Sequence, residues 1–300
     1  MRKVNFCVIT AFFLLLGSAR AAVLKPETAA AFDQYIRLTE EQQAADLRKG
    51  RFFIIDRLPD ASRQQMYARL RGGEIYIEQL QTRDDGKPIR VPGGMIHHWV
   101  GVMFIPGATL AQVAAVLQDY DHHKDIYAPD VRQSKLLDRE VDEARIFYQF
   151  YRKTIVTVVL DANFDVHFAT DGPTRAMSRS YSTRIVEVEN FGTPQQRELP
   201  AGNDHGYLWR LDSYWRIEEK DGGAYVQMEW IGLTRNIPFL FAWLVNPLTR
   251  SIPRSVLSNL LTATRKAVIS REHADFFCCH PRASSRVPHP SLPLARVGNH

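Results

Sequence analysis

The chain has 300 residues, of which 45% are hydrophobic and 24% are charged. This length and composition allow a sizeable core, which excludes general disorder. The formal net charge is +5, but Arg2, Lys3 and Arg20 precede residue 22 and four more arginines lie beyond residue 270. The body of the chain is therefore nearly neutral, and without a basic stripe the sequence predicts no nucleic-acid binding.

The first 21 residues have the pattern of a secretory signal peptide. Arg2 and Lys3 precede an apolar run over residues 6–16, and Ala19-Arg20-Ala21 follows as a small-residue cleavage site. The run is shorter than a helix that spans a bilayer, so a retained anchor is the weaker alternative. We expect cleavage near Ala21 and export to the periplasm or the extracellular space.

An extension over residues 22–93 precedes the main domain. Residues 27–49 and 61–70 have helical composition, and Gly72-Gly73 ends the second helix. Residues 74–80 alternate as a strand. We expect this extension to pack against the main domain, residues 94–270, rather than move independently.

The main domain is predicted to begin with a strand and a helix. The strand, 96–105, stops at Pro106-Gly107, and Thr109 can cap a helix whose apolar residues recur at helical spacing. A short helical segment at 120–127 and a series of strands follow: 134–139, 145–152, 154–168 and 175–188. A terminal helix, 255–269, precedes a Pro- and Ser-rich disordered tail at 271–300. Because strands and helices do not alternate, the order predicts an α+β fold.

Two strands near the end of the domain carry a period of two. The apolar face of the first carries Tyr207, Trp209, Leu211, Trp215 and Ile217, and its other face carries Arg210, Asp212, Arg216 and Glu218. Asp221-Gly222-Gly223 then turns the chain into 224–233, where Val226, Met228 and Trp230 alternate with Gln227 and Glu229. This pattern predicts a hairpin with one dry face.

The two faces of this hairpin have different expected surroundings. The aromatic face needs a cover, and the terminal helix is the candidate, with a hydrophobic pocket between them. The charged side chains are expected to form a cross-strand ladder on solvent. With the faces reversed, Arg210, Asp212, Arg216 and Glu229 would instead form a charged cluster in a cleft.

Several segments resemble a known family. They are Val102 to Ala108 leading into Leu110 to Val113 and Leu117 to Tyr120, then Tyr127 to Val131 before Ser134 to Leu137, and Ile237-Pro238 and Ile252-Pro253 before the last helix. Over residues 96–270 this order resembles the START-like helix-grip superfamily of lipid-transfer domains, polyketide cyclases and aromatases. The resemblance implies a curved antiparallel sheet wrapped around a long C-terminal helix, with an apolar tunnel between them.

The candidate ligand-binding residues are the apolar side chains expected to line this space. Apolar ligands bind in concave sites that bury most of their surface. The candidates are Trp209, Leu211, Trp215, Met228, Trp230, Phe164, Phe168, Leu257, Leu260 and Leu261. Few small residues are expected to face these rings, and any single inward ring is more often a core residue than a ligand contact.

Catalytic and metal sites are not predicted. The chain has no Gly-x-Ser-x-Gly, phosphate-binding glycine loop or His-Glu-x-x-His motif. His97 and His98 should point to opposite faces of a strand, and Asp119 with His122 or His123 would make at most a weak pair at a solvated helix end. Cys278 and Cys279 are tail thiols or a link between two chains.

We therefore expect an exported protein that binds a lipid or another hydrophobic small molecule, without a cofactor and with transient membrane contact. A polyketide cyclase or aromatase that uses the same cavity is the alternative. A third is an envelope module that binds a protein partner, whose identity the sequence does not indicate.

Overall fold

The structure, a computed structural model, describes residues 23–153, 157–200, 202–236 and 254–271. The segment predicted to be a signal peptide and the two cysteines, Cys278 and Cys279, lie outside these residues. The elements, in chain order, are α2 (Pro26–Arg48), η1 (Ile54–Arg57), α3 (Asp60–Arg71), β1 (Tyr76–Gln79), β2 (Arg83–Asp84), β3 (Lys87–Pro88), β4 (Gly94–Pro106), α4 (Leu110–Leu117), η2 (Tyr120–His122), α5 (His123–Ile126), β5 (Val131–Arg139), β6 (Glu143–Lys153), β7 (Thr157–Thr170), β8 (Arg175–Glu189), β9 (Arg197–Glu198), β10 (Arg210–Lys220), β11 (Gly223–Arg235) and a final helix, 254–271.

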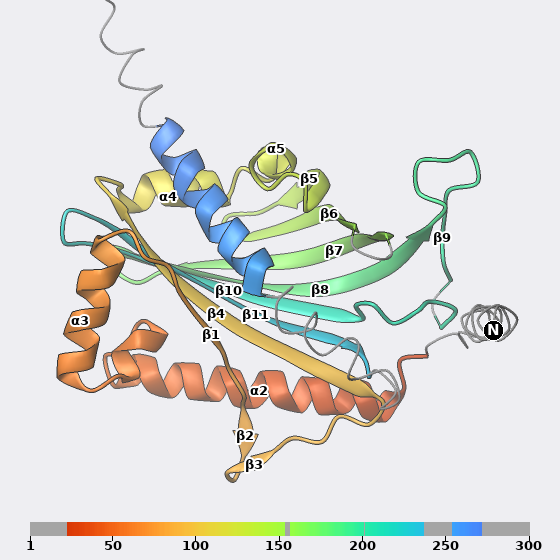
Figure 1. Cartoon of the computed structure of the whole chain (residues 1–300), viewed down its shortest axis with the longest axis horizontal. Helices are drawn as coiled ribbons and strands as arrows, with labels where there is room; N and C mark the ends of the chain where they lie inside the picture. The colour runs from red at the N-terminus through yellow and green to blue at the C-terminus, as the bar shows by residue number, and fades with distance from the viewer. Residues whose placement is uncertain (1–22, 154–156, 201, 237–253, 272–300) are drawn as a thin grey trace, which may run out of the picture.

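One large antiparallel sheet organises the molecule. Its strands run in the order β1-β4-β11-β10-β8-β7-β6-β5, with β9 paired to β8. The sheet lies between two layers of helices, with α2 and α3 on one side and α4, α5 and the final helix on the other (Figure 1). We call the side that meets the final helix the grip face and the side under α2 and α3 the outer face. The predicted α+β helix-grip architecture is confirmed.

The predicted hairpin has the expected alternation. β10 and β11 pair from Arg210 opposite Leu233 to Lys220 opposite Gly223. Trp215 and Met228 pack in the cluster around Leu257 and Leu261 on the grip face. The charged side chains of the same strands therefore point to the outer face.

None of the helices that the structure describes has the length and the apolar composition of a membrane-spanning segment.

The charged side chains are not on solvent, and in this respect the sequence-based expectation is wrong. Asp212, Arg216 and Glu229 are only 2%, 6% and 4% exposed. The reason is the N-terminal extension: Phe32, Tyr35 and Ile36 of α2 pack with Ile231 and Leu233 of β11. The extension is thus a layer of the fold, and it covers a charged surface.

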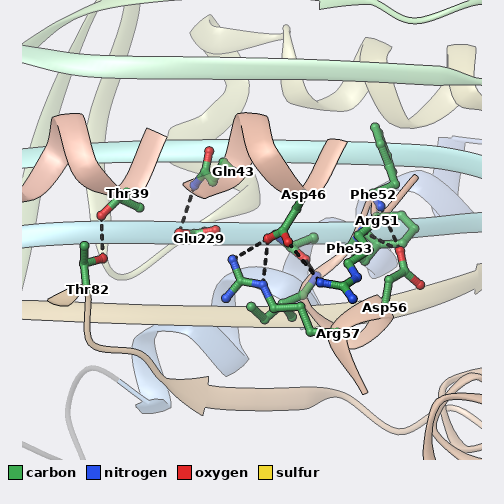
Figure 2. A network of polar contacts seen from close by, with 12 residues as sticks. Thr39, Gln43, Asp46, Arg51, Phe52, Phe53, Asp56, Arg57, Thr82 and Glu229 are labelled. Carbon is green, nitrogen blue, oxygen red and sulfur yellow. Dashed lines mark hydrogen bonds and ion pairs between the residues drawn. The ribbon is translucent and has the colours of Figure 1, made fainter. Parts of the chain in front are cut away.

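Glu229 lies beneath α2 and is hydrogen-bonded to Gln43 of this helix (Figure 2). Its Oε1 accepts from Gln43 Nε2 of α2 at 3.0 Å and contacts His98 Nε2 of β4 at 2.8 Å. His98 Nδ1 in turn lies 3.0 Å from the Tyr35 hydroxyl of α2. Burial opposes the charge of Glu229, but His98, Arg216 and Gln43 outweigh it and lower the pKa of this carboxyl. The helix is therefore attached through polar groups that leave no charge at Glu229 uncompensated.

The segment that follows α2 is held in the same way. Asp46 accepts from Arg57 at 2.6 Å, and Asp56 accepts the backbone N–H groups of Phe52 and Phe53 at 2.9 and 2.8 Å (Figure 2). Arg216 Nη1 donates to the carbonyl oxygen of Phe52 at 2.6 Å. The turn after α2 is thus joined to β10 through one buried guanidinium.

Asp212, unlike the other buried charged residues of the outer face described above, has a carboxylate oxygen without a hydrogen-bond partner. This atom, Oδ1, is buried, and burial raises the pKa of the carboxyl to about 7, although Arg210 opposes the shift. The side chains of Glu40 and Asp33 add to the raised pKa. The folded state therefore holds a proton on Asp212 more tightly than the unfolded chain does.

Asp212→Asn should make the protein more stable at alkaline pH. A carboxyl whose folded pKa exceeds its unfolded pKa costs stability as the pH rises from about 4 to about 7, and asparagine removes this cost. We expect a gain in the free energy of unfolding near pH 8, with an upper limit of about 4 kcal/mol, and much less gain near pH 5. Denaturant titrations at the two pH values measure it. Exposed Asp138→Asn is the control, and an equal gain for Asp212→Asn at both pH values would contradict the assignment.

Candidate ligand-binding site

The register of the sheet aligns a row of side chains across the grip face. Trp99 of β4 lies opposite Trp230 of β11, which lies opposite Ser213 of β10. Ser213 lies opposite Ser180 of β8, and Ser180 opposite Val166 of β7. Large rings therefore occupy one flank of the row, and small hydroxyls occupy its centre.

The neighbouring row repeats this arrangement. Gly101, Met228, Trp215, Ser178 and Phe168 follow one another across the same five strands. The Ser180 and Ser213 hydroxyls bond each other at 2.7 Å, whereas the Ser178 hydroxyl has no such bond within the described chain. The expectation that few small residues face the rings is wrong, because serines of β8 and β10 form the middle of the floor.

The final helix rests directly on one flank of this floor. Leu257 and Leu261 are fully buried, and a Cβ atom added to Gly101 would lie only 2.5 Å from Leu261 Cδ1. Glycine at this position of β4 lets the helix approach the backbone closely. The final helix is thus packed closely against the β4 flank of the floor.

The structure brings most of the predicted site residues together, in two adjoining clusters. Trp215, Met228, Trp230, Leu257, Leu260 and Leu261 belong to the cluster under the final helix. Leu211, Phe164 and Phe168 belong to the next one, with Tyr148 and Phe150 of β6. The prediction for Trp209 is wrong, because this residue packs with Phe32 and Tyr35 in the cluster that α2 covers. Trp209 precedes β10, so the side-chain alternation of that strand does not apply to it.

The sequence analysis did not predict a polar pair, His123 and Tyr148, that lies beside the second cluster. His123, the first residue of α5, is 3% exposed, and its Nδ1 lies 2.6 Å from the Tyr148 hydroxyl. Its Nε2 lies 3.0 Å from the carbonyl oxygen of Val116. Burial lowers the pKa of His123 to about 4, so the imidazole is neutral near pH 7. Only the apolar helix before it, with buried Val116, could have suggested that one histidine of the His122-His123 pair points inward.

The other histidines behave as the pattern predicted. His97 bonds Thr234 at 3.0 Å, whereas its neighbour His98 bonds Glu229 on the outer face, so the two are on opposite faces. His122 is exposed and contacts Asp119 at 2.6 Å. Across the residues that the structure describes, no three metal-ligating side chains gather.

The hydroxyls of Tyr127 and Tyr148 are buried beside His123. Burial raises the pKa of Tyr127 to about 12 and that of Tyr148 well above 10, so protein atoms surround both hydroxyls. Each residue as a whole is half-buried. Two open clefts, of about 450 and 570 Å³, lie elsewhere, one beside Tyr35 and the other beside Arg57.

The strand order and the closing helix give the chain a helix-grip fold, the architecture that the sequence resemblance implied. A STAR-related lipid transfer protein from Xanthomonas axonopodis is similar, with TM-score 0.42 and 16% identity, over 64% of this chain and 98% of that chain. Human STARD10 has TM-score 0.42 and 11% identity, over 74% and 84%. The Zhui aromatase/cyclase of a Streptomyces species has TM-score 0.38 and 15% identity, over 64% and 100%. No family model matches the chain, and no curated protein matches it.

Gly101→Val should separate the final helix from β4. The added side chain would overlap Leu261, and overpacking of this kind costs about 1–3 kcal/mol. Thermal unfolding measures the loss. In a Leu261→Ala background, where the overlapping methyl group is gone, the same substitution should cost clearly less. Equal costs in the two backgrounds would show that the helix does not rest on Gly101.

Proposed function

We propose that the protein binds a lipid or another hydrophobic small molecule on the grip face, between β6–β8 and the final helix, and carries it without covalent chemistry. One observation supports this most directly. Large apolar side chains of the grip face keep accessible surface, although they lie in the two hydrophobic clusters: Leu211, Trp215, Trp230, Phe150, Phe168 and Leu260. Apolar surface of this size inside a fold is stabilised when a ligand covers it.

The shape of the floor fits a ligand that lies along the sheet. Serines of β8 and β10 leave a low strip between Trp215 on one side and Phe168 on the other. Met228, next to Trp215, adds an adaptable thioether side chain. Such a strip accommodates a chain or a flat ring system between aromatic walls.

The polar groups of the site favour carriage over acid–base catalysis. A general base works best with a pKa near the operating pH. His123 has a pKa lowered to about 4, and both of its ring nitrogens are already hydrogen-bonded inside the protein. The histidine therefore orients Tyr148, and the cyclase alternative would need another proton-transfer group.

Export extends the proposal. The signal-like segment at residues 1–21 would send the carrier into an aqueous compartment outside the cytoplasm. An apolar molecule crossing such a compartment needs a protein that shields it from water, which the grip face would do.

Native mass spectrometry of the protein purified from its own host tests carriage, followed by solvent extraction of the bound molecule. We expect an apolar molecule in a defined ratio to the protein. A mass that always equals that of the bare chain would instead favour the protein-interaction module.

Ser178→Leu should block the site while keeping the fold. Leucine would fill the strip between Trp215 and Phe168, so the bound molecule should be lost or its affinity lowered at least about tenfold, which corresponds to about 1.4 kcal/mol. Thr183→Leu, an exposed position on the same strand, is the matched control and should bind normally. Full occupancy of a folded Ser178→Leu protein would place the ligand elsewhere.

A further inference from the structure

The corner of the outer face where α2 ends and α3 begins carries an open cleft of about 570 Å³. It belongs to the N-terminal extension, on the side of the sheet opposite the final helix (Figure 1). Four basic side chains line it beside two acidic ones: Lys49, Arg51, Arg57 and Arg63, with Asp56 and Asp60. A charged cleft of this kind is unsuited to an apolar molecule, so its ligand must be an ion or a polar group.

Asp46 of α2, a buried carboxylate, holds two of these arginines in place (Figure 2). Its Oδ2 accepts from Arg57 Nε at 2.7 Å and lies 2.6 Å from Arg57 Nη2. Arg51 Nη1 lies 3.7 Å from Asp46 Oδ1, which is an ion pair but too long for a hydrogen bond. One carboxylate balances one positive charge, so this pair of arginines keeps a surplus charge.

Three of the basic side chains have donors that no described residue uses. Arg57 meets Asp46 through Nε and Nη2, which leaves its Nη1 without a hydrogen bond within the described chain. The Arg51 guanidinium and the Lys49 ammonium make no hydrogen bond to any described residue. All three are accessible to solvent, since the side chains of Arg51 and Arg57 are 43% and 32% exposed and Lys49 is exposed. A ligand in the cleft can therefore accept from these N–H groups without displacing a protein partner.

The acidic groups of the wall are compensated inside the protein. Asp56 accepts two backbone N–H groups through Oδ2, at 2.9 and 2.8 Å, and the Tyr67 hydroxyl through Oδ1 at 2.7 Å. Asp60 is exposed and pairs with Arg63 at 2.9 Å. The uncompensated positive charge of the wall therefore lies with the other three basic side chains.

We propose that this cleft binds a phosphate group, with Arg51, Arg57 and Lys49 as its donors. The planar fork of a guanidinium matches the oxygens of a phosphate, and a lysine ammonium binds phosphate as a point charge. A phosphate monoester presents three terminal oxygens in different directions, so several side chains can donate to it at once, whereas a carboxylate has two oxygens in one plane. The phosphate is either the headgroup of an anionic lipid in a membrane or part of a soluble ester.

The cleft and the grip face are separate, because the sheet lies between α2 and the final helix (Figure 1). A lipid headgroup bound in the cleft would hold the carrier at a membrane surface while the grip face keeps its own ligand. The inference therefore goes beyond the proposed function, and each can fail without the other.

Two binding measurements on the full chain, at constant ionic strength, test the two sources of phosphate. In isothermal titration calorimetry, glycerol 3-phosphate should bind saturably and at least about tenfold more tightly than glycerate, its carboxylate counterpart, as expected for one more charge-assisted hydrogen bond. In flotation with phosphatidylcholine vesicles, added phosphatidic acid should increase the bound fraction of protein. The stronger response identifies the source, and no response in either measurement overturns the inference.

Arg51→Gln is the decisive variant, because the Arg51 side chain makes no hydrogen bond among the described residues and its loss should leave the fold intact. It should weaken phosphate binding about ten- to hundredfold, the effect of one charge-assisted contact. Arg48→Gln is the matched control: it removes the same charge from an exposed neighbour outside the cleft wall and should change binding less than about twofold. Equal weakening by the two variants would indicate general charge attraction and overturn the site. The apolar molecule found by native mass spectrometry should be the same in all three proteins, which keeps this result separate from that of the proposed function.

Discussion

The fold depends on the polar attachment of α2 to the outer face of the sheet. Glu229 is buried, and its carboxylate is stable there because it forms hydrogen bonds with Gln43 and His98. With this face closed, the central strands have one side that is fully covered. The grip face can then be covered incompletely. If the outer face were uncovered as well, the sheet would expose apolar surface on both sides.

The grip face divides into a part on which the final helix packs closely and a part with small side chains between aromatic ones. On β4, Gly101 brings Leu257 and Leu261 against the backbone, so the helix is anchored there. On β8, Ser178 and Ser180 keep the floor low where it lies beside the aromatic walls. Because close packing resists rearrangement, the contact of the helix with β4 fixes its position over the neighbouring strands.

The hydrogen bonds of His123 and Thr264 depend on the direction of donation more than on charge. His123 is neutral and Thr264 is uncharged, yet each accepts the proton of a neighbouring tyrosine because a backbone carbonyl has already taken its own. The two series of hydrogen bonds start on different elements, α4 and the final helix, and converge beside α5.

Local patterns determined the order of elements, the β10–β11 hairpin and the separation of its aromatic and charged faces, because side-chain alternation is a property of each strand alone. For the same reason the sequence also indicated the large side chains of the floor, such as Trp215, Trp230 and Phe168, but not the serines between them. Tertiary structure decided what covers each face: α2 buried Asp212, Arg216 and Glu229, and Trp209 left the floor where the alternation of β10 had not yet begun. It also brought Tyr148 to His123, since contacts between segments far apart in the chain follow from the packing of whole elements and leave no periodic signal in the sequence.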